Sequence, residues 1–240
     1  MNRGVALMER TQDTAGAARA PRADAGTVRA TARDANALAW VVEMYAMPTD
    51  LLERLTGATA GAMRQMTHRW RRAGWVETAR LGEGPQWVWA TADGVARFGR
   101  HSYAANVPSA ARLRHIRAAI LLRMALEKRW PDAEWRSERE LRWELGQRRG
   151  AEAVRAHMPD AEFEMTNAKG VRTLAAVEVE LTPKAIDRTK AIVNEVLQTY
   201  NAVLYAVTPE ARPVVERVRE ALPSNAQTRL QVMNMPEGER

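Results

Sequence analysis

The strongest constraint on the fold of this chain is the alternation Val177-Glu178-Val179-Glu180-Leu181. Successive side chains of a strand point to opposite faces, so the two glutamates share one face while the apolar residues face a core. Two neighbouring carboxylates on a half-buried strand repel each other and resist desolvation. A hard cation such as Mg²⁺ or Mn²⁺ removes that cost by binding carboxylate oxygens. The pattern therefore predicts a strand that carries a metal site.

The composition indicates a basic globular protein. Of the 240 residues, 46% are hydrophobic and 27% charged, and the formal net charge is +7. This charge favours a polyanionic partner, first nucleic acid and second an anionic membrane surface. The chain has no cysteine, which excludes disulfides and thiolate zinc sites and fits a reducing compartment. It also lacks an apolar run long enough to cross a bilayer and the apolar core of a signal peptide, so we expect a cytoplasmic protein with no membrane partner.

The composition and the positions of turn-forming residues predict four segments. The first is poor in residues that could be buried, and we interpret it as a disordered tail. The predicted boundaries are 1–34 for this tail, 35–105 for a DNA-binding domain, 106–130 for a linker helix and 131–240 for a second domain.

The 35–105 segment has the element order of a winged helix-turn-helix. Three helical patterns are followed by strands at Trp75–Ala79 and Gln86–Ala90, joined by a glycine-rich turn. Thr59 is suited to cap the third helix, which would run to Arg72 and act as the recognition helix. Arginine and glutamine suit base edges in the major groove and the phosphates at its rim. The alternative is a winged helix used for protein contacts, with solvated arginines. The predicted DNA-binding residues are Arg64, Gln65, His68, Arg69, Arg71 and Arg72.

The linker helix belongs to a long stretch of single-sign charge. Residues 94–126 contain six arginines and no acid. Such a run is either a solvated face or a surface that follows a phosphate backbone, and the sequence leaves both readings open. His115 lies in the same helix, where a lone histidine is more often structural than catalytic.

The second domain reads as a helix, a β-hairpin, a helix and a further strand. This order is the core of the restriction-endonuclease-like fold, whose nucleases carry a PD-(D/E)XK motif. Its acids hold Mg²⁺ and its lysine helps to activate water. Here Pro159-Asp160 supplies the first acid and Glu178 the second, while Glu180 stands where the lysine is expected. Lys184, placed in the first turn of the next helix, would return its ammonium group to the cluster.

Together these residues form the candidate active site. We expect Asp160, Glu178, Glu180 and Lys184 to be catalytic, with the three acids binding Mg²⁺ or Mn²⁺. Each part also has a plainer interpretation. Pro-Asp pairs occur by chance in many loops, and an E-x-E strand is common at solvent-facing edges, where both acids are hydrated.

Three segments resemble the replication-relaxation family of plasmids and other mobile elements. They are W-R-S-E-R-E-L-R, H-M-P-D-A and A-V-E-V-E-L-T-P-K-A-I-D-R, and the resemblance extends over roughly residues 35–222. It implies DNA binding linked to plasmid replication or mobile-element maintenance, with a nuclease-like C-terminal domain.

Two functions are compatible with these patterns. The first is a double-stranded DNA-binding protein of a plasmid or mobile element whose nuclease-like domain performs Mg²⁺-dependent phosphodiester cleavage. The second is a non-enzymatic regulator, or an accessory factor of a relaxase or replication initiator, with a degenerate nuclease domain. A homodimer would suit palindromic sites, but no residue pattern specifies one.

Overall fold

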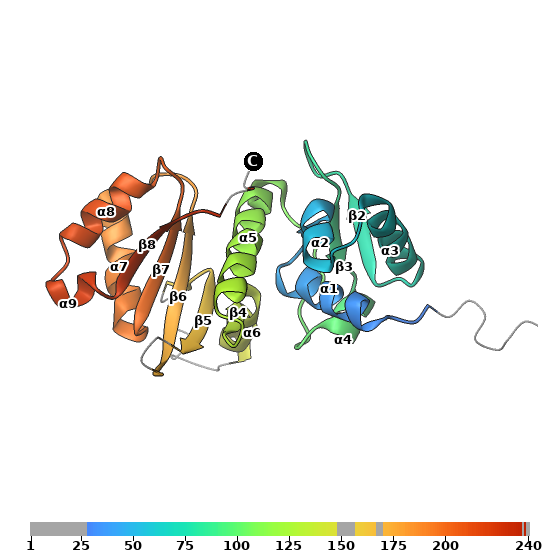
Figure 1. Cartoon of the computed structure of the whole chain (residues 1–240), viewed down its shortest axis with the longest axis horizontal. Helices are drawn as coiled ribbons and strands as arrows, with labels where there is room; N and C mark the ends of the chain where they lie inside the picture. Colours follow the sequence, from blue (N-terminus) through green and yellow to red (C-terminus); the bar gives the residue numbers. More distant parts are fainter. Residues whose placement is uncertain (1–27, 148–156, 167–169, 237, 239–240) are drawn as a thin grey trace, which may run out of the picture.

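The computed structural model describes residues 28–147, 157–166, 170–236 and 238. Within these residues the chain is a mixed α and β protein, as predicted. A small three-stranded sheet with its helices lies at one end, and a five-stranded sheet with helices on both faces lies at the other (Figure 1). Residues 1–27 of the predicted tail lie outside the described residues.

The N-terminal unit contains four helices and three short strands. They are α1 (Ala32–Glu43), β1 (Met47–Pro48), α2 (Thr49–Thr56), α3 (Ala60–Arg72), β2 (Val76–Ala79), β3 (Trp87–Ala90) and α4 (Ala92–Phe98). The sheet order is β1-β3-β2, and both pairings are antiparallel. The two-residue strand β1 was not predicted, because its Met-Pro sequence carries no alternation.

Helix α1 begins inside the segment predicted as tail. Thr31 and Asp34 form a capping box, in which the Thr31 hydroxyl accepts from the Asp34 amide and the Asp34 carboxylate accepts from the Thr31 amide. This reciprocal pair satisfies two amides that a helix start leaves open. The same carboxylate is fully buried and accepts hydrogen bonds from Arg69 and from the Trp70 indole. Asp34 thus fixes α3 against the start of α1.

A long helix separates the two sheets. A 3-10 turn at Ala110–Arg112 leads into α5 (Leu113–Arg129), which lies between the N-terminal unit and the five-stranded sheet (Figure 1). Its buried residues include Ile116, Ile120 and Leu126. One hydrophobic cluster runs from α1 through α5 to β6, so the linker helix is part of a continuous core.

The C-terminal unit is built on a mixed sheet. Its elements are β4 (Glu134–Ser137), α6 (Glu138–Gln147), β5 (Ala161–Thr166), β6 (Arg172–Glu180), α7 (Ile186–Thr199), β7 (Ala202–Val207), α8 (Arg212–Glu220), α9 (Ser224–Gln227) and β8 (Leu230–Asn234). The sheet order is β4-β5-β6-β7-β8. The first two pairings are antiparallel and the last two parallel. Helices α7 and α8 cover the face opposite to α5, where they form a second core.

Two helix starts differ from the sequence prediction. Because proline suits the first position of a helix, Thr182-Pro183 and Thr208-Pro209 favour helix starts at the prolines, but α7 and α8 begin at Ile186 and Arg212. Before α8, the Thr208 hydroxyl accepts from the Ala211 amide and thus stabilises a turn ahead of the helix. Before α7, the chain stays non-helical up to Ala185. The short α9 was not predicted.

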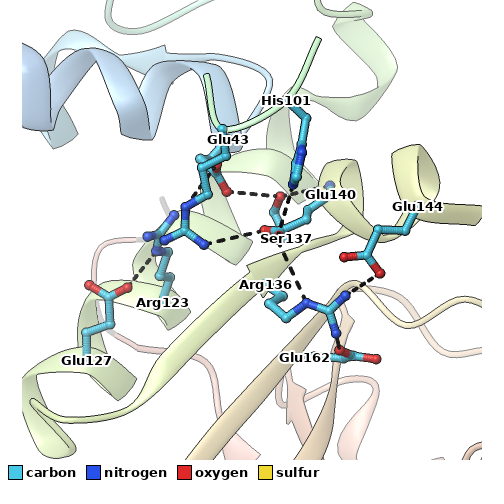
Figure 2. Close-up of polar contacts among 10 residues, drawn as sticks. Glu43, His101, Arg123, Glu127, Arg136, Ser137, Glu140, Glu144 and Glu162 are labelled. Carbon is cyan, nitrogen blue, oxygen red and sulfur yellow. Dashed lines mark hydrogen bonds and ion pairs between the residues drawn. The ribbon is translucent and has the colours of Figure 1, made fainter. Parts of the chain in front are cut away.

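A polar seam joins the two units. We call the buried residues Glu43, Arg139 and Glu140 the seam. Arg100 lies 3.7 Å from both carboxylates, which Figure 2 shows with their neighbours. Arg139 donates to the carbonyls of Val42 and Ala104, both in the N-terminal part of the chain. Its guanidinium also lies over the rings of two tyrosines. The two units are therefore held together by buried polar contacts as well as by the core.

None of the helices in the described parts of the chain is both long and apolar enough to cross a membrane.

Candidate functional site

Strand β6 places its two glutamates as its alternation predicts. Val177 and Val179 are buried in the core shared with α5. Glu178 and Glu180 lie on the opposite face, and they are only 4% and 5% exposed. The solvated-edge interpretation of the E-x-E pattern is therefore wrong.

Asp160 lies at the end of the β5–β6 ladder. Its amide donates to the Val177 carbonyl, and its Oδ2 accepts from the Val179 amide at 2.8 Å. Its Oδ1 lies 2.9 Å from Nε2 of His115 on α5. Burial opposes protonation of this imidazole, but the hydrogen bond and charge of Asp160 outweigh it and raise the pKa of His115. His115 thus ties α5 to the first acid of the predicted site.

Glu178 is paired with a histidine that sequence reasoning did not assign a role. Its Oε1 lies 2.7 Å from Nε2 of His157, whose own amide donates to Glu195 on α7 at 2.5 Å. Burial raises the pKa of Glu178 to about 7, because the charged form loses its hydration. The hydrogen bond with Glu178 raises the pKa of His157. The two side chains therefore form a buried hydrogen-bonded pair at the end of β6.

Glu180 is paired with the lysine that the sequence singled out. The Lys184 ammonium lies 2.5 Å from Glu180 Oε2. The prediction that Lys184 lies in the first turn of α7 is wrong. The helix begins at Ile186, so Lys184 precedes it. The extended approach of the chain nevertheless returns the ammonium to the cluster, as expected.

A buried tyrosine completes the surroundings of the acids. Tyr205 stands opposite Glu178 in the β6–β7 register and is fully buried. Among the described residues its hydroxyl has no hydrogen-bond partner. Burial and the nearby carboxylates raise its pKa. This residue could not have been found from the sequence, because its place depends on the parallel pairing of β6 with β7.

As arranged, the acids do not form a ready metal site. Asp160, Glu178 and Glu180 gather around one end of β6, but each carboxylate is engaged by a basic side chain. Within the described ranges no three His, Cys, Asp or Glu side chains are grouped to hold a metal ion. The expected Mg²⁺ or Mn²⁺ would have to displace these bases.

Helix α3 exposes most of its predicted DNA-binding residues. Met63, Met66 and Trp70 face the core. On the other side, at i, i+3 and i+4 spacing, the residues Arg64, Gln65, His68, Arg71 and Arg72 are exposed. Arg69 differs, because it is half-buried and its Nη2 lies 2.5 Å from Asp34.

Two open grooves flank this exposed face of α3. One, of about 340 Å³, lies between the start of the helix and the β2–β3 hairpin, and Arg64, Arg80 and Gln86 are among its lining residues. The other, of about 380 Å³, lies at the end of the helix and is lined in part by His68, Arg71 and Arg72. Cationic side chains thus line grooves at both ends of the helix.

The arginines of the acid-free stretch are mostly paired. Acids distant in sequence reach three of them: Arg112 contacts Glu138, Arg117 contacts Asp50, and Arg100 lies 3.7 Å from both Glu43 and Glu140. Arg123 is buried against Glu127 and the Trp40 ring. These contacts favour a structural role for the run over phosphate tracking.

Comparisons of the chain with protein-family models, curated proteins and solved structures found no match. The likeness to the replication-relaxation family stays a prediction from its sequence motifs.

Proposed function

We propose that this chain binds double-stranded DNA through α3 and the β2–β3 hairpin, used as a winged helix-turn-helix. The observation that carries the proposal is the exposed cationic face of α3. Within the described residues no acid pairs with Arg64, Arg71 or Arg72. An uncompensated row of cations on a helix attracts phosphates and releases their counterions.

The dimensions of the N-terminal unit suit this role. Helix α3 has 13 residues and is held from behind by its apolar side and by Asp34. A helix presented in this way fits the width of the major groove. The hairpin beside it would contact the adjacent backbone, with Arg80 facing the same groove of the protein as Arg64.

For the C-terminal unit we propose a restriction-endonuclease-like fold in a regulator or accessory factor of a mobile element. Support comes from the order hairpin β5–β6, helix α7, parallel strand β7. The pairing of each acid with a base favours the non-enzymatic role. A relaxase or replication initiator is then the partner class to search for by co-purification.

The DNA proposal is tested by fluorescence anisotropy with a labelled duplex at about 0.15 M salt. The Arg64→Ala/Arg71→Ala/Arg72→Ala variant should bind roughly ten- to a hundredfold more weakly than the wild type. Arg217→Ala, which removes one exposed cation from α8 at the far end of the molecule, is the control and should bind normally (Figure 1). Equal binding by the triple variant and the wild type would contradict the proposal.

Metal-dependent cleavage is the second candidate, favoured by the gathering of three acids at one end of β6. Asp160, Glu178 and Glu180 would hold the ion, which would supply an activated water and charge stabilisation. A plasmid-nicking assay with Mg²⁺ and Mn²⁺ separates the candidates. Nicking by the wild type that is lost in Glu178→Ala and Glu180→Ala would favour the enzyme. Equal nicking by all three proteins would contradict metal-dependent cleavage at this site.

A further inference from the structure

The acids at the end of β6 are matched one to one by bases. His115 contacts Asp160, His157 contacts Glu178 and Lys184 contacts Glu180. The three bases come from different parts of the chain, namely α5, the segment before β5 and the segment before α7. Independent segments thus converge to neutralise one cluster.

This pairing removes the electrostatic reason to expect a metal. His157 Nε2 lies 2.7 Å from Glu178 Oε1 and already occupies that carboxylate oxygen. The Lys184 ammonium does the same for Glu180. Mg²⁺ binds carboxylate oxygens at about 2.0–2.1 Å and would meet these nitrogens, which already lie 2.5 to 2.7 Å from the same oxygens. A cation and the two bases therefore compete for one place.

Burial makes the bases necessary when no cation is present. Glu178 and Glu180 are almost fully buried. A buried carboxylate that loses its partner is strongly destabilising. The Tyr205 hydroxyl, which has no hydrogen-bond partner among the described residues, lies on the same sheet face and offers one more O–H donor, but no charge.

We propose that His157 and Lys184 take the place of a divalent cation in this cluster. The wild-type site is therefore metal-free, and the two bases hold the end of β6 against α7. Removing both bases converts the cluster into a divalent-cation site formed by the carboxylates. This inference concerns the C-terminal unit and does not depend on DNA binding by α3.

The test is a Mn²⁺ titration of the wild type, of His157→Ala/Lys184→Met and of Lys190→Met. Lys190 is exposed on α7 and serves as the matched control. Binding is followed by the electron paramagnetic resonance signal of free Mn²⁺ and stability by thermal melting. The wild type and control should show no saturable binding and no shift. The double variant should melt lower without metal and recover by about 5–10 °C when Mn²⁺ exceeds its Kd about a hundredfold.

Each outcome decides the proposal. Saturable Mn²⁺ binding by the wild type that is lost in Glu178→Gln would overturn it. A folded double variant that shows neither Mn²⁺ binding nor a shift in melting temperature would also overturn it. If the double variant does not fold alone, it is refolded with Mn²⁺: recovery supports the proposal and failure contradicts it. DNA binding is measured on the same proteins in EDTA, so a failed DNA proposal is recognised separately.

Discussion

Three arginines of α3 and two arginines of α5 and α6 lie in similar sequence surroundings but in opposite structural ones. On α3, Arg64, Arg71 and Arg72 are exposed and face two grooves. Around the seam, Arg123 and Arg139 are buried against rings, carbonyls and a carboxylate. A run of like charge thus stays exposed on one element and is paired with acids from other elements on another. The predictions below test this division.

The largest effect is expected at the seam. Arg139→Ala removes the donor to two carbonyls and the cation that lies over two tyrosine rings. We expect a loss of about 3–5 kcal/mol in the free energy of unfolding, measured in urea. Arg71→Ala on α3 is the matched control and should change it by less than about 0.5 kcal/mol. Similar losses for both variants would remove the distinction between the two regions.

Asp34→Ala tests whether Arg69 belongs with the structural arginines. The substitution removes a cap and leaves Arg69 and the Trp70 indole without their acceptor, so about 3 kcal/mol should be lost. Burial alone would raise the pKa of Asp34, but the hydrogen bonds from Thr31 and Trp70 and the charge of Arg69 lower it.

The sign of the pH effect follows from that lowered pKa. The contribution of Asp34 is present above its unfolded pKa of about 3.8 and is lost as the pH falls through the lower folded value. The stability gap between wild type and variant should therefore close in strong acid. A gap that stays constant down to about pH 2 would contradict this.

The His157–Glu178 pair predicts a change near neutral pH. Burial raises the pKa of Glu178 from 4.5 to about 7, so stability falls as the pH rises through that window. His157 has a raised pKa as well, so its contribution is present below 6.5 and is lost as the pH rises through the folded value. The free energy of unfolding should drop by about 2 kcal/mol between about pH 5 and 8. Glu178→Gln should flatten this profile; an unchanged slope would argue against the pair.

The smallest effect is expected at the buried carboxylates of the seam. Glu43 and Glu140 are both buried, and burial raises the pKa of Glu43 (Figure 2). Because the charged form is disfavoured there, Glu43→Gln should leave stability unchanged or raise it by up to about 1 kcal/mol near pH 8. A large loss would mean that Arg100, which lies 3.7 Å away, relies on this charge.

Local patterns were enough to predict most elements but not the partners of their side chains. The alternation in β6 and the Thr59 cap of α3 are set by residues adjacent in sequence, and the structure confirms both. The pairing of Arg112 with Glu138 or of Asp34 with Arg69 joins residues far apart, so no local pattern reveals it. The late start of α7 could not be predicted either, because Thr-Pro favours a helix start only where the backbone that follows it is helical at once.

The candidate site was predicted in part. Its three acids and Lys184 are brought together, but His115, His157 and Tyr205 join them through sheet pairing and helix packing. The residues adjacent in sequence to His115 and His157 give no signal of the carboxylates that these histidines contact. The charge balance of the cluster therefore became visible only in three dimensions.

The most direct measurement of DNA binding by α3 is the salt dependence of affinity. The logarithm of the association constant is plotted against the logarithm of salt concentration for the wild type, the Arg64→Ala/Arg71→Ala/Arg72→Ala variant and Arg217→Ala. If all three α3 arginines contact phosphates, the triple variant's slope should be shallower by about 2–3, and the control should match the wild type. Identical slopes for all three proteins would contradict a DNA-binding role for α3.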